Sequence, residues 1–216
     1  MKSVLVVVAT DLEARALPDL PGARLVVSGV GAVNAALGVA LAAAGERPEL
    51  IVNVGIGGAY SRGGLRPLDL AVSREMIFAG LGAEDGAGFL GLSQLGFPLL
   101  MTPAGPVFNA LPAAPVAADF AQAVGAAFGP CLTLETVTGS VETAERLQTR
   151  WPGALCEGME GAGVGLAGAR LGIPTLEFRI ISNLVGPRDR SAWRISEALG
   201  VLGGALRAGW SVLHGA

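Results

Sequence analysis

The stretch CEGMEGAGVGLAGARLGIPTLEFRIISN, residues 156–183, decides how the chain folds. It predicts a short strand, a helix of small residues, a tight Gly-Ile-Pro turn and a second strand over residues 175–181. Glu160 opens the helix, and Ser182 with Asn183 closes the second strand. Ligands of open α/β sheets bind at the carboxyl ends of the strands, so we expect these polar groups to converge on one crevice.

The composition argues against several classes of protein. The chain has 216 residues and a net charge of −3, without a run of five or more basic residues, so a nucleic-acid partner is not expected. It has two cysteines and one histidine but no CxxC motif or histidine cluster, so neither a metal site nor a disulfide framework is expected. Cysteine usage of this kind favours a reducing cytoplasm.

The apolar stretches do not indicate a membrane protein. The apolar run over residues 4–9 is short, and Asp11 and Glu13 follow it, so it is interpreted as a first strand rather than a signal peptide. Residues 25–45 are nearly uncharged, but glycines and polar residues interrupt them, whereas a membrane span requires about 20 strongly apolar residues. We interpret them as a strand followed by a buried helix.

Predicted strands and helices alternate along the chain. The strands are expected over residues 4–9, 24–27, 50–54, 69–78, 131–137 and 175–181. Helices are expected after a capping box at Thr10 and over residues 32–44, 116–128, 141–150 and 192–213, the last of them capped by Ser191. Residues 79–115 show little periodicity and are expected to form a long excursion over the site or in a subunit contact. The alternation predicts a single α/β domain over residues 1–216 with a mixed, mostly parallel sheet.

Two glycine segments follow predicted strands. In the first, the dinucleotide fingerprint GxGxxG fails because Asn34 stands where its third glycine is required, so no nucleotide cofactor is expected. The following helix, residues 32–44, is apolar nearly all round, which predicts burial. In the second segment, residues 53–59, Gly57 and Gly58 either let the backbone approach a ligand closely or only form a tight turn.

Two carboxylates are candidates for chemistry, and each has a structural alternative. Glu13 could act as a base at the end of a strand, or it could serve only as the acid of the capping box. Glu160 begins a glycine-rich helix that must be closely packed, so its charge needs partners or a ligand. Alternatively, Glu160 only complements the helix dipole.

Two polar residues of the strand over residues 175–181 and its end are also candidates. Asn183 offers a donor and an acceptor, so it can recognise a heterocycle edge that carries C=O beside N–H, or it can simply cap the strand. Arg179 lies among apolar neighbours, so we expect it to pair with a buried acid and to act as structural support.

Together these residues resemble the nucleoside phosphorylase/nucleosidase superfamily, and the order of motifs is similar to its methylthioadenosine/S-adenosylhomocysteine nucleosidase branch. The resemblance implies a three-layer sandwich in which helices flank a central sheet. It implies that Met159 and Glu160 grip the ribose, that Asn183 contacts the purine and that Glu13 activates water. It also implies a substrate site that includes Gly57, Gly58, Val137, Thr138 and Ser182.

Two departures from the family pattern bear on the substrate. The family has a purine-reading aspartate where this chain has Asn183, and an asparagine suits a 6-oxopurine such as hypoxanthine rather than adenine. Phosphorylases of this family place a serine on phosphate where this chain has Ile56, so water is the expected nucleophile. Residues 136–139 replace the segment that brackets adenine in the adenine-specific branch.

Residues 157–161, 182–185 and 188–193 resemble the futalosine hydrolases in particular. This implies cleavage of futalosine to hypoxanthine and dehypoxanthinyl futalosine in menaquinone biosynthesis, by a homodimer or larger homo-oligomer, with residues 89–111 as a candidate interface. Trp193 is expected to line the 5′ side of the substrate or to be ordinary core, and the arginine that meets the substrate carboxylate is not assigned. The alternatives are a methylthioadenosine/S-adenosylhomocysteine-type or inosine nucleosidase and a non-catalytic nucleotide-binding module.

Overall fold

The apolar run at the start of the chain forms the buried strand β1 (Val4–Val8). Strands β2 (Ala23–Val27) and β3 (Leu50–Ala59) pair with β1 on its two sides, both in parallel. Its alternating side chains enter two different hydrophobic clusters, one on each face of the sheet. The strand is therefore covered on both faces, as its uninterrupted apolar pattern predicts.

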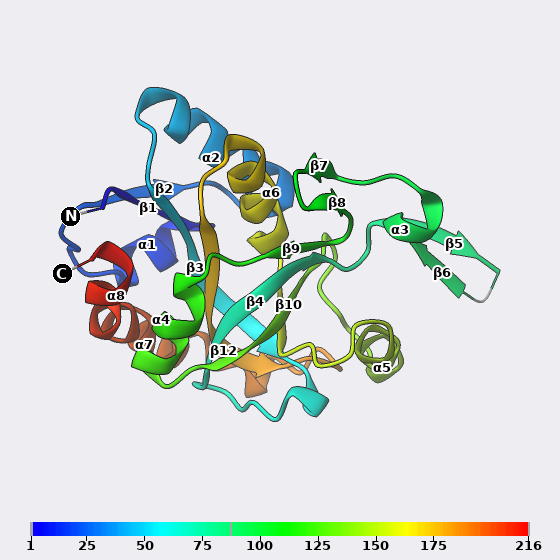
Figure 1. Cartoon of the computed structure of the whole chain (residues 1–216). Helices are drawn as coiled ribbons and strands as arrows, with labels where there is room; N and C mark the ends of the chain where they lie inside the picture. The colour runs from blue at the N-terminus through cyan, green and yellow to red at the C-terminus, as the bar shows by residue number, and fades with distance from the viewer. Residues whose placement is uncertain (1, 87, 216) are drawn as a thin grey trace.

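The computed structural model describes residues 2–86 and 88–215 (Figure 1). The further strands are β4 (Leu70–Phe78), β5 (Gly82–Asp85), β6 (Gly88–Gly91), β7 (Leu100–Thr102), β8 (Gly105–Val107), β9 (Ala110–Pro112), β10 (Ala127–Thr133), β11 (Cys156–Gly158) and β12 (Thr175–Leu184). The helices are α1 (Asp11–Ala16), α2 (Ala32–Gly45), α3 (Leu92–Leu95), α4 (Val116–Val124), α5 (Val141–Arg150), α6 (Gly161–Leu171), α7 (Ile195–Ala208) and α8 (Trp210–His214), with 3-10 turns η1 (Ser61–Gly63) and η2 (Arg190–Ala192).

The central sheet is mixed and mostly parallel, which confirms the predicted fold class. Its strand order is β11-β10-β4-β12-β3-β1-β2, with β9 added beside β4. Antiparallel pairing occurs between β12 and β4, between β4 and β9 and between β11 and β3, whereas the other pairs are parallel. The pairing of β11 with β3 closes β3, β12, β4, β10 and β11 into a ring of five strands. This closure was not predicted.

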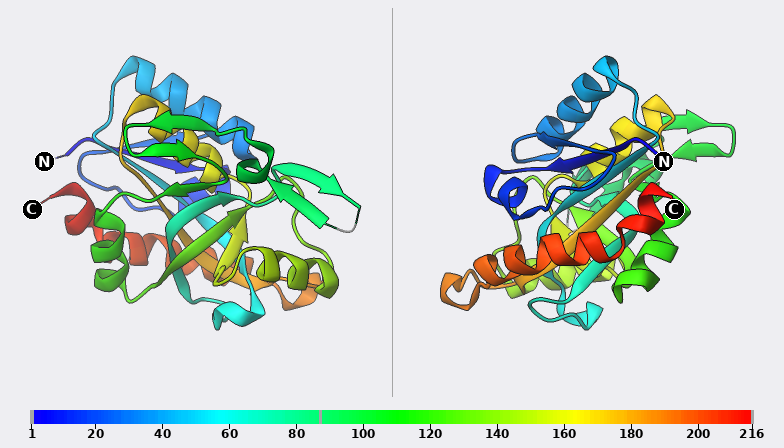
Figure 2. Two further views of the ribbon diagram at one scale, coloured as in Figure 1. Left: turned by 45° about the vertical axis from the view of Figure 1, so that its right-hand side comes forward. Right: turned by 90° about the vertical axis from the view of Figure 1, so that its left-hand side faces the viewer.

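Helices form a layer on each face of the sheet, so the expected three-layer arrangement is confirmed. Helices α4, α7 and α8 pack on one face, and α2 and α6 pack on the other (Figure 2). Full burial of each valine or leucine in these clusters contributes about 1.5–3 kcal/mol.

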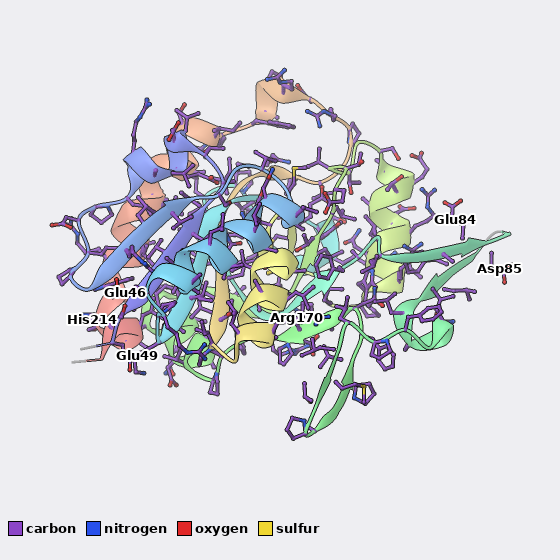
Figure 3. The ribbon with its side chains drawn as sticks, turned by 90° about the horizontal axis from the view of Figure 1, so that it is seen from above. Glu46, Glu49, Glu84, Asp85, Arg170 and His214 are labelled. Atoms are coloured by element: carbon purple, nitrogen blue, oxygen red, sulfur yellow. The ribbon has the colours of Figure 1, made fainter. Side chains whose placement is uncertain are left out.

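The β5–β6 hairpin, which carries Glu84 and Asp85, projects at the opposite end of the molecule from His214 (Figure 3).

The glycines of α6 allow its neighbours to approach closely, as the sequence predicts. A methyl group at Gly163 would collide with the backbone carbonyl of Ala32 on α2, and one at Gly168 would collide with the hydroxyl of Thr175. The helix ends at Gly172, whose φ of 65° lies in the left-handed region. The order of strand, small-residue helix, turn and strand over residues 156–183 is therefore confirmed.

Three predicted boundaries, one of a helix and two of a strand, are wrong. The helix expected over residues 116–128 ends at Val124, because Gly125 terminates it in the left-handed region with φ 68°. Phe128 belongs instead to β10, so the strand predicted over residues 131–137 begins earlier and stops at Thr133. Because turn glycines end helices without an apolar-pattern signal, the sequence placed this boundary too late.

The predicted C-terminal helix over residues 192–213 is divided. It forms α7 and α8 with a break at Gly209, where an added methyl group would collide with the Phe120 ring of α4. Ser191 does not cap it. Instead, the N–H and hydroxyl of Ser191 donate to Asp189 within the turn that contains η2.

Helix α2 is less buried than its composition predicts. Ala32, Ala35 and Val39 are buried, but Val33, Leu37 and Leu41 lie on an exposed face. Only one side of the helix packs on the sheet and on α6, and no described part of this chain covers the other side. The prediction that residues 32–44 are buried nearly all round is therefore wrong for one face of α2.

Two predicted loops contain regular structure. Residues 53–59, expected as a glycine turn, continue strand β3 to Ala59, and β12 likewise extends past residue 181 to Leu184. Residues 79–115 form two short hairpins and strand β9 rather than one irregular excursion.

In the described part of the chain, no helix has the length and apolarity needed to cross a membrane.

Candidate active site

A cavity of about 340 Å³ lies at the carboxyl ends of β1, β3 and β12. All ten side chains or glycines predicted for the site line it: Glu13, Gly57, Gly58, Val137, Thr138, Met159, Glu160, Ser182, Asn183 and Trp193. Larger hollows of about 490, 800 and 610 Å³ lie elsewhere, and no more than one carboxylate lines either of the first two. The third is lined by Glu142 and Glu145 of α5, but both of these side chains are exposed. The 340 Å³ cavity is therefore the one in which buried ionisable side chains gather, namely Glu13, Glu157, Glu160 and Arg179.

Glu13 reaches this cavity from the first turn of α1. Its Oε2 accepts hydrogen bonds from the N–H groups of Ala9 and Thr10 and from the Thr10 hydroxyl, at 3.0–3.1 Å. Among the described residues, its Oε1 accepts only the N–H of Ile56, at 3.2 Å. The capping box is present, so this interpretation is confirmed, yet the same carboxylate leaves Oε1 with free acceptor capacity at the cavity.

Glu160 is held at the N-terminus of α6 by the backbone and by an arginine. Its Oε1 accepts the N–H of Gly31 at 3.1 Å, and its Oε2 accepts from Arg179 Nη2 at 3.2 Å and from the Met159 N–H at 3.3 Å. Gly31 has a φ of 97°, so the turn that presents its N–H requires glycine. The carboxylate is thus fixed by partners from three separate segments.

Arg179 lies at the centre of the buried charges. Its Nε donates to Glu177 Oε1 at 2.8 Å, and its Nη2 donates both to Glu160 and to Asn53 Oδ1, the latter at 2.7 Å. The side chain is only 2% exposed. Burial alone would lower the pKa of Arg179, but Glu177, Glu160 and Glu13 together raise it above its ordinary value. The prediction that Arg179 pairs with a buried acid is confirmed.

Glu177 is the acid that sequence reasoning missed. It is fully buried, and among the described residues its Oε2 has no hydrogen-bond partner. Burial raises the pKa of Glu177, and the attraction of Arg179 only partly opposes this. The signal was present, because residues two apart on a strand point to the same face, which places Glu177 beside Arg179.

Glu157 is a second missed acid, and it anchors the other wall of the cavity. Its Oε1 accepts the Thr138 N–H at 2.8 Å, and its Oε2 accepts the hydroxyls of Thr138 and Tyr60, both at 2.6 Å. Burial and the adjacent Glu157 raise the pKa of Tyr60, so the phenol remains a donor. Val137 and Thr138 are therefore held in place by a carboxylate on β11.

Asn183 retains one free donor and one free acceptor. Its Oδ1 accepts from the Ser182 hydroxyl at 2.8 Å, and its Nδ2 donates to the Leu184 carbonyl at 2.9 Å. An amide oxygen has two acceptor sites and an amide nitrogen has two hydrogens. A shift in the β12–β3 register after Ile181 and the small Gly58 give this amide access to the cavity. Asn183 can thus engage a ligand edge while keeping its contacts within the protein.

Comparison with known proteins identifies relatives of this chain. Residues 22–205 match the family model described as the phosphorylase superfamily. A futalosine hydrolase of Streptomyces coelicolor is 45% identical over 88% of this chain and 78% of that protein. A futalosine hydrolase of Thermus thermophilus is 36% identical over 83% of this chain and 77% of that protein.

Solved structures share the fold. An S-adenosylhomocysteine nucleosidase of Streptococcus pyogenes, solved with 5-methylthiotubericidin, superposes with a TM-score of 0.79 over 96% of this chain and 95% of that one. The two sequences are 19% identical, so the likeness concerns the fold. It agrees with the central mixed sheet and its flanking helices.

We expect Glu177→Gln to change how stability depends on pH. With a pKa raised above its ordinary value of 4.5, Glu177 binds its proton more tightly in the folded chain than in the unfolded chain. The unfolding free energy of the native chain should therefore fall as pH rises above that value, whereas the glutamine variant lacks this loss. In urea titrations from pH 4.5 to 8, the unfolding free energy of the variant should therefore rise relative to that of the native chain.

The matched control is Glu145→Gln, which removes an exposed carboxylate from α5. Its unfolding free energy should stay within about 0.5 kcal/mol of the native value throughout. If the difference between Glu177→Gln and the native chain does not grow with pH, the raised pKa is wrong.

Proposed function

The chain belongs to the phosphorylase superfamily and, within it, to the futalosine hydrolase family, and on this premise we propose that it hydrolyses the N-glycosidic bond of futalosine. The products would be hypoxanthine and dehypoxanthinyl futalosine, in menaquinone biosynthesis. The observation that carries the proposal is the pair of buried carboxylates, Glu13 and Glu160, which line one cavity with the guanidinium of Arg179 beside them.

Glu160 and Met159 are proposed to hold the ribose. Oε1 of Glu160 accepts one backbone N–H and keeps capacity for a sugar hydroxyl. Hydrogen bonds from both ribose hydroxyls to this carboxylate would fix the sugar, with Met159 packing against it. Positioning of this kind orients C1′ toward the base and the nucleophile, which reduces the entropic part of the barrier.

Glu13 is proposed as the general base. The free acceptor capacity of Oε1 suits a water molecule aimed at C1′. As the C1′–N9 bond breaks, its electron pair goes to the purine and the ribosyl group gains oxocarbenium character. The water oxygen then bonds to C1′, and Glu13 takes the proton that the water loses.

Asn183 is proposed to recognise the base. Its free N–H can donate to O6 of hypoxanthine, and its Oδ1 can accept from N7–H once water has delivered a proton to N7 of the leaving base. The bond to O6 strengthens as negative charge moves onto the leaving purine. An amide is not an acid at neutral pH, so Asn183 orients the base and stabilises its charge rather than protonating it.

Water is favoured over phosphate as the nucleophile. Residue 56 is an isoleucine, whose side chain cannot bond phosphate, and its backbone N–H already donates to Glu13. An anion placed there would meet the Glu13 carboxylate, which opposes binding. Both features support hydrolysis.

Two broader expectations belong to the same proposal. Cys131 and Cys156 remain free thiols with their sulfurs 3.5 Å apart, which supports a reducing cytoplasm. A homo-oligomer is proposed as well, and the exposed apolar side chains Val33, Leu37 and Leu41 on α2 favour such an assembly.

The proposed activity predicts a specific pattern of product release. Purified protein should release hypoxanthine from futalosine at the same rate with and without phosphate, as followed by chromatography. Methylthioadenosine should release little adenine, because Asn183 suits a 6-oxopurine. A requirement for phosphate would indicate a phosphorylase, adenine as the main product would indicate the other nucleosidase branch, and no release from either substrate or from inosine would favour a binding module.

Glu13→Gln should reduce kcat for futalosine by about 10²–10⁴-fold, because glutamine keeps the capping contacts but cannot accept a proton. The affinity for hypoxanthine, measured by calorimetry, should stay within about threefold. Asp11→Asn is the control, since it neutralises an exposed acid of the same helical turn. Turnover near the native rate in Glu13→Gln would remove Glu13 from the role of base.

Asn183→Asp should weaken the preference for a 6-oxopurine. The measurement is kcat/KM for futalosine relative to its 6-amino analogue, and we expect this ratio to fall about tenfold or more, because a carboxylate cannot donate to O6. Asn34→Asp adds the same charge at an exposed site on α2 and should leave the ratio unchanged. An unaltered ratio in Asn183→Asp would contradict base recognition by this side chain.

A further inference from the structure

Part of the cavity wall is used by neither the sugar nor the base in the proposed mechanism. It consists of Leu12, Val30, Arg188, Trp193, Ile195 and Leu199. The wall is apolar and aromatic except for one guanidinium. A nucleoside whose base, C1′ and ribose hydroxyls are already engaged has one substituent left, the one at its 5′ carbon.

Arg188 is the cation of this wall, and it is available to a ligand. Two arginines line the cavity, and Arg179 is already bonded to Glu177, Glu160 and Asn53. Among the residues that the structure describes, Arg188 forms no salt bridge. The adjacent Asp189 accepts from the N–H and hydroxyl of Ser191 instead.

Trp193 provides an aromatic surface next to this charge. The guanidinium of Arg188 lies 5.1 Å from the centre of the Trp193 ring, within the range of a cation–π contact. The N–H of Arg194 donates to the Ser182 carbonyl at 2.8 Å, which holds the tryptophan segment beside the strand end that carries Asn183. The earlier alternative, that Trp193 is ordinary core, does not account for its place in the cavity wall.

The charges of the cavity explain why an anionic substrate needs this arginine. Glu13, Glu157 and Glu160 line the cavity, so a further carboxylate would be repelled from most of it. A guanidinium binds a carboxylate with two parallel hydrogen bonds, and the indole face accommodates an attached aromatic ring. The wall therefore suits an aromatic acid.

We propose that Arg188, stacked on Trp193, binds the carboxylate of an aromatic acid carried at the 5′ carbon of the nucleoside, and that this pair selects such substrates over uncharged nucleosides. The inference rests on the proposed function and deepens it, because the aromatic keto-acid of futalosine is a group of this class. It assigns the arginine that the sequence left open.

The test compares futalosine with its methyl ester, which differs only in the masked carboxylate. The native enzyme should prefer the acid in kcat/KM by about tenfold or more, and Arg188→Ala should lose this preference through a higher KM for the acid, with kcat within about threefold. Arg188→Lys should restore part of it, since lysine keeps the charge but not the planar fork. Salt should raise the KM of the native enzyme for the acid but not that of Arg188→Ala.

Arg190→Ala is the matched control. Arg190 lies 6.0 Å from the same indole ring but is not part of the cavity wall, so its removal should change the preference less than twofold. Equal effects of Arg188→Ala and Arg190→Ala would overturn the assignment, as would an acid-to-ester preference that Arg188→Ala retains.

The inference can fail separately from the proposed function. If the native enzyme releases no hypoxanthine from futalosine, the function is wrong, and the subsite is then judged by calorimetric binding of dehypoxanthinyl futalosine. Binding that is at least about tenfold weaker in Arg188→Ala than in the native protein would support the subsite. Equal affinity in the two proteins would overturn it.

Discussion

The rest of the site depends on the buried guanidinium of Arg179. It is held in the middle of β12 by Glu177, and it bonds to Asn53 on β3 and to Glu160 at the start of α6. An unpaired charge at such a depth costs several kcal/mol, so these elements must stay together for any one of them to be stable. Three glycines leave room for these side chains. A methyl group at Gly55 would crowd Arg179 and Glu13, one at Gly158 would crowd Arg179, and one at Gly161 would crowd Glu177.

This arrangement links the charge of the core to the chemistry of the cavity. One cation lies among three buried carboxylates, so it offsets their negative charge only in part. Burial raises the pKa of Glu177, while backbone N–H groups donate to the carboxylates of Glu13 and Glu160. The carboxylates of Glu13 and Glu160 are thus fixed by strands and helix ends, which is the condition for preorganised catalysis in the proposed mechanism.

Apolar periodicity predicted the mixed, mostly parallel sheet. The resemblance of the motifs to a known superfamily predicted the flanking layers and ten of the residues that line the cavity. Prediction from the sequence failed where the outcome depends on contacts between distant segments. The closure of β11 onto β3, the break at Gly209 against Phe120 and the exposed face of α2 have no local signal. Glu177 was missed for the opposite reason, since its place two residues before Arg179 on one strand pointed to a buried partner rather than to a ligand.

Specificity is separable from this buried network. Arg179 and its partners lie on β3, β12 and α6, whereas the groups proposed to read the base and the 5′ substituent lie on residues 137–138 and 183–193, at strand ends and in connecting segments. Asn183 and Arg188 contact neither Arg179 nor Glu13 in the hydrogen bonds and ion pairs of the described residues. Substitutions at Asn183 or Arg188 can therefore change which nucleoside fits without removing a hydrogen bond from Arg179 or Glu13. In the proposed mechanism, substrate choice therefore rests on Asn183 and Arg188 and bond cleavage on Glu13 and Glu160, so the two can change independently on one fold.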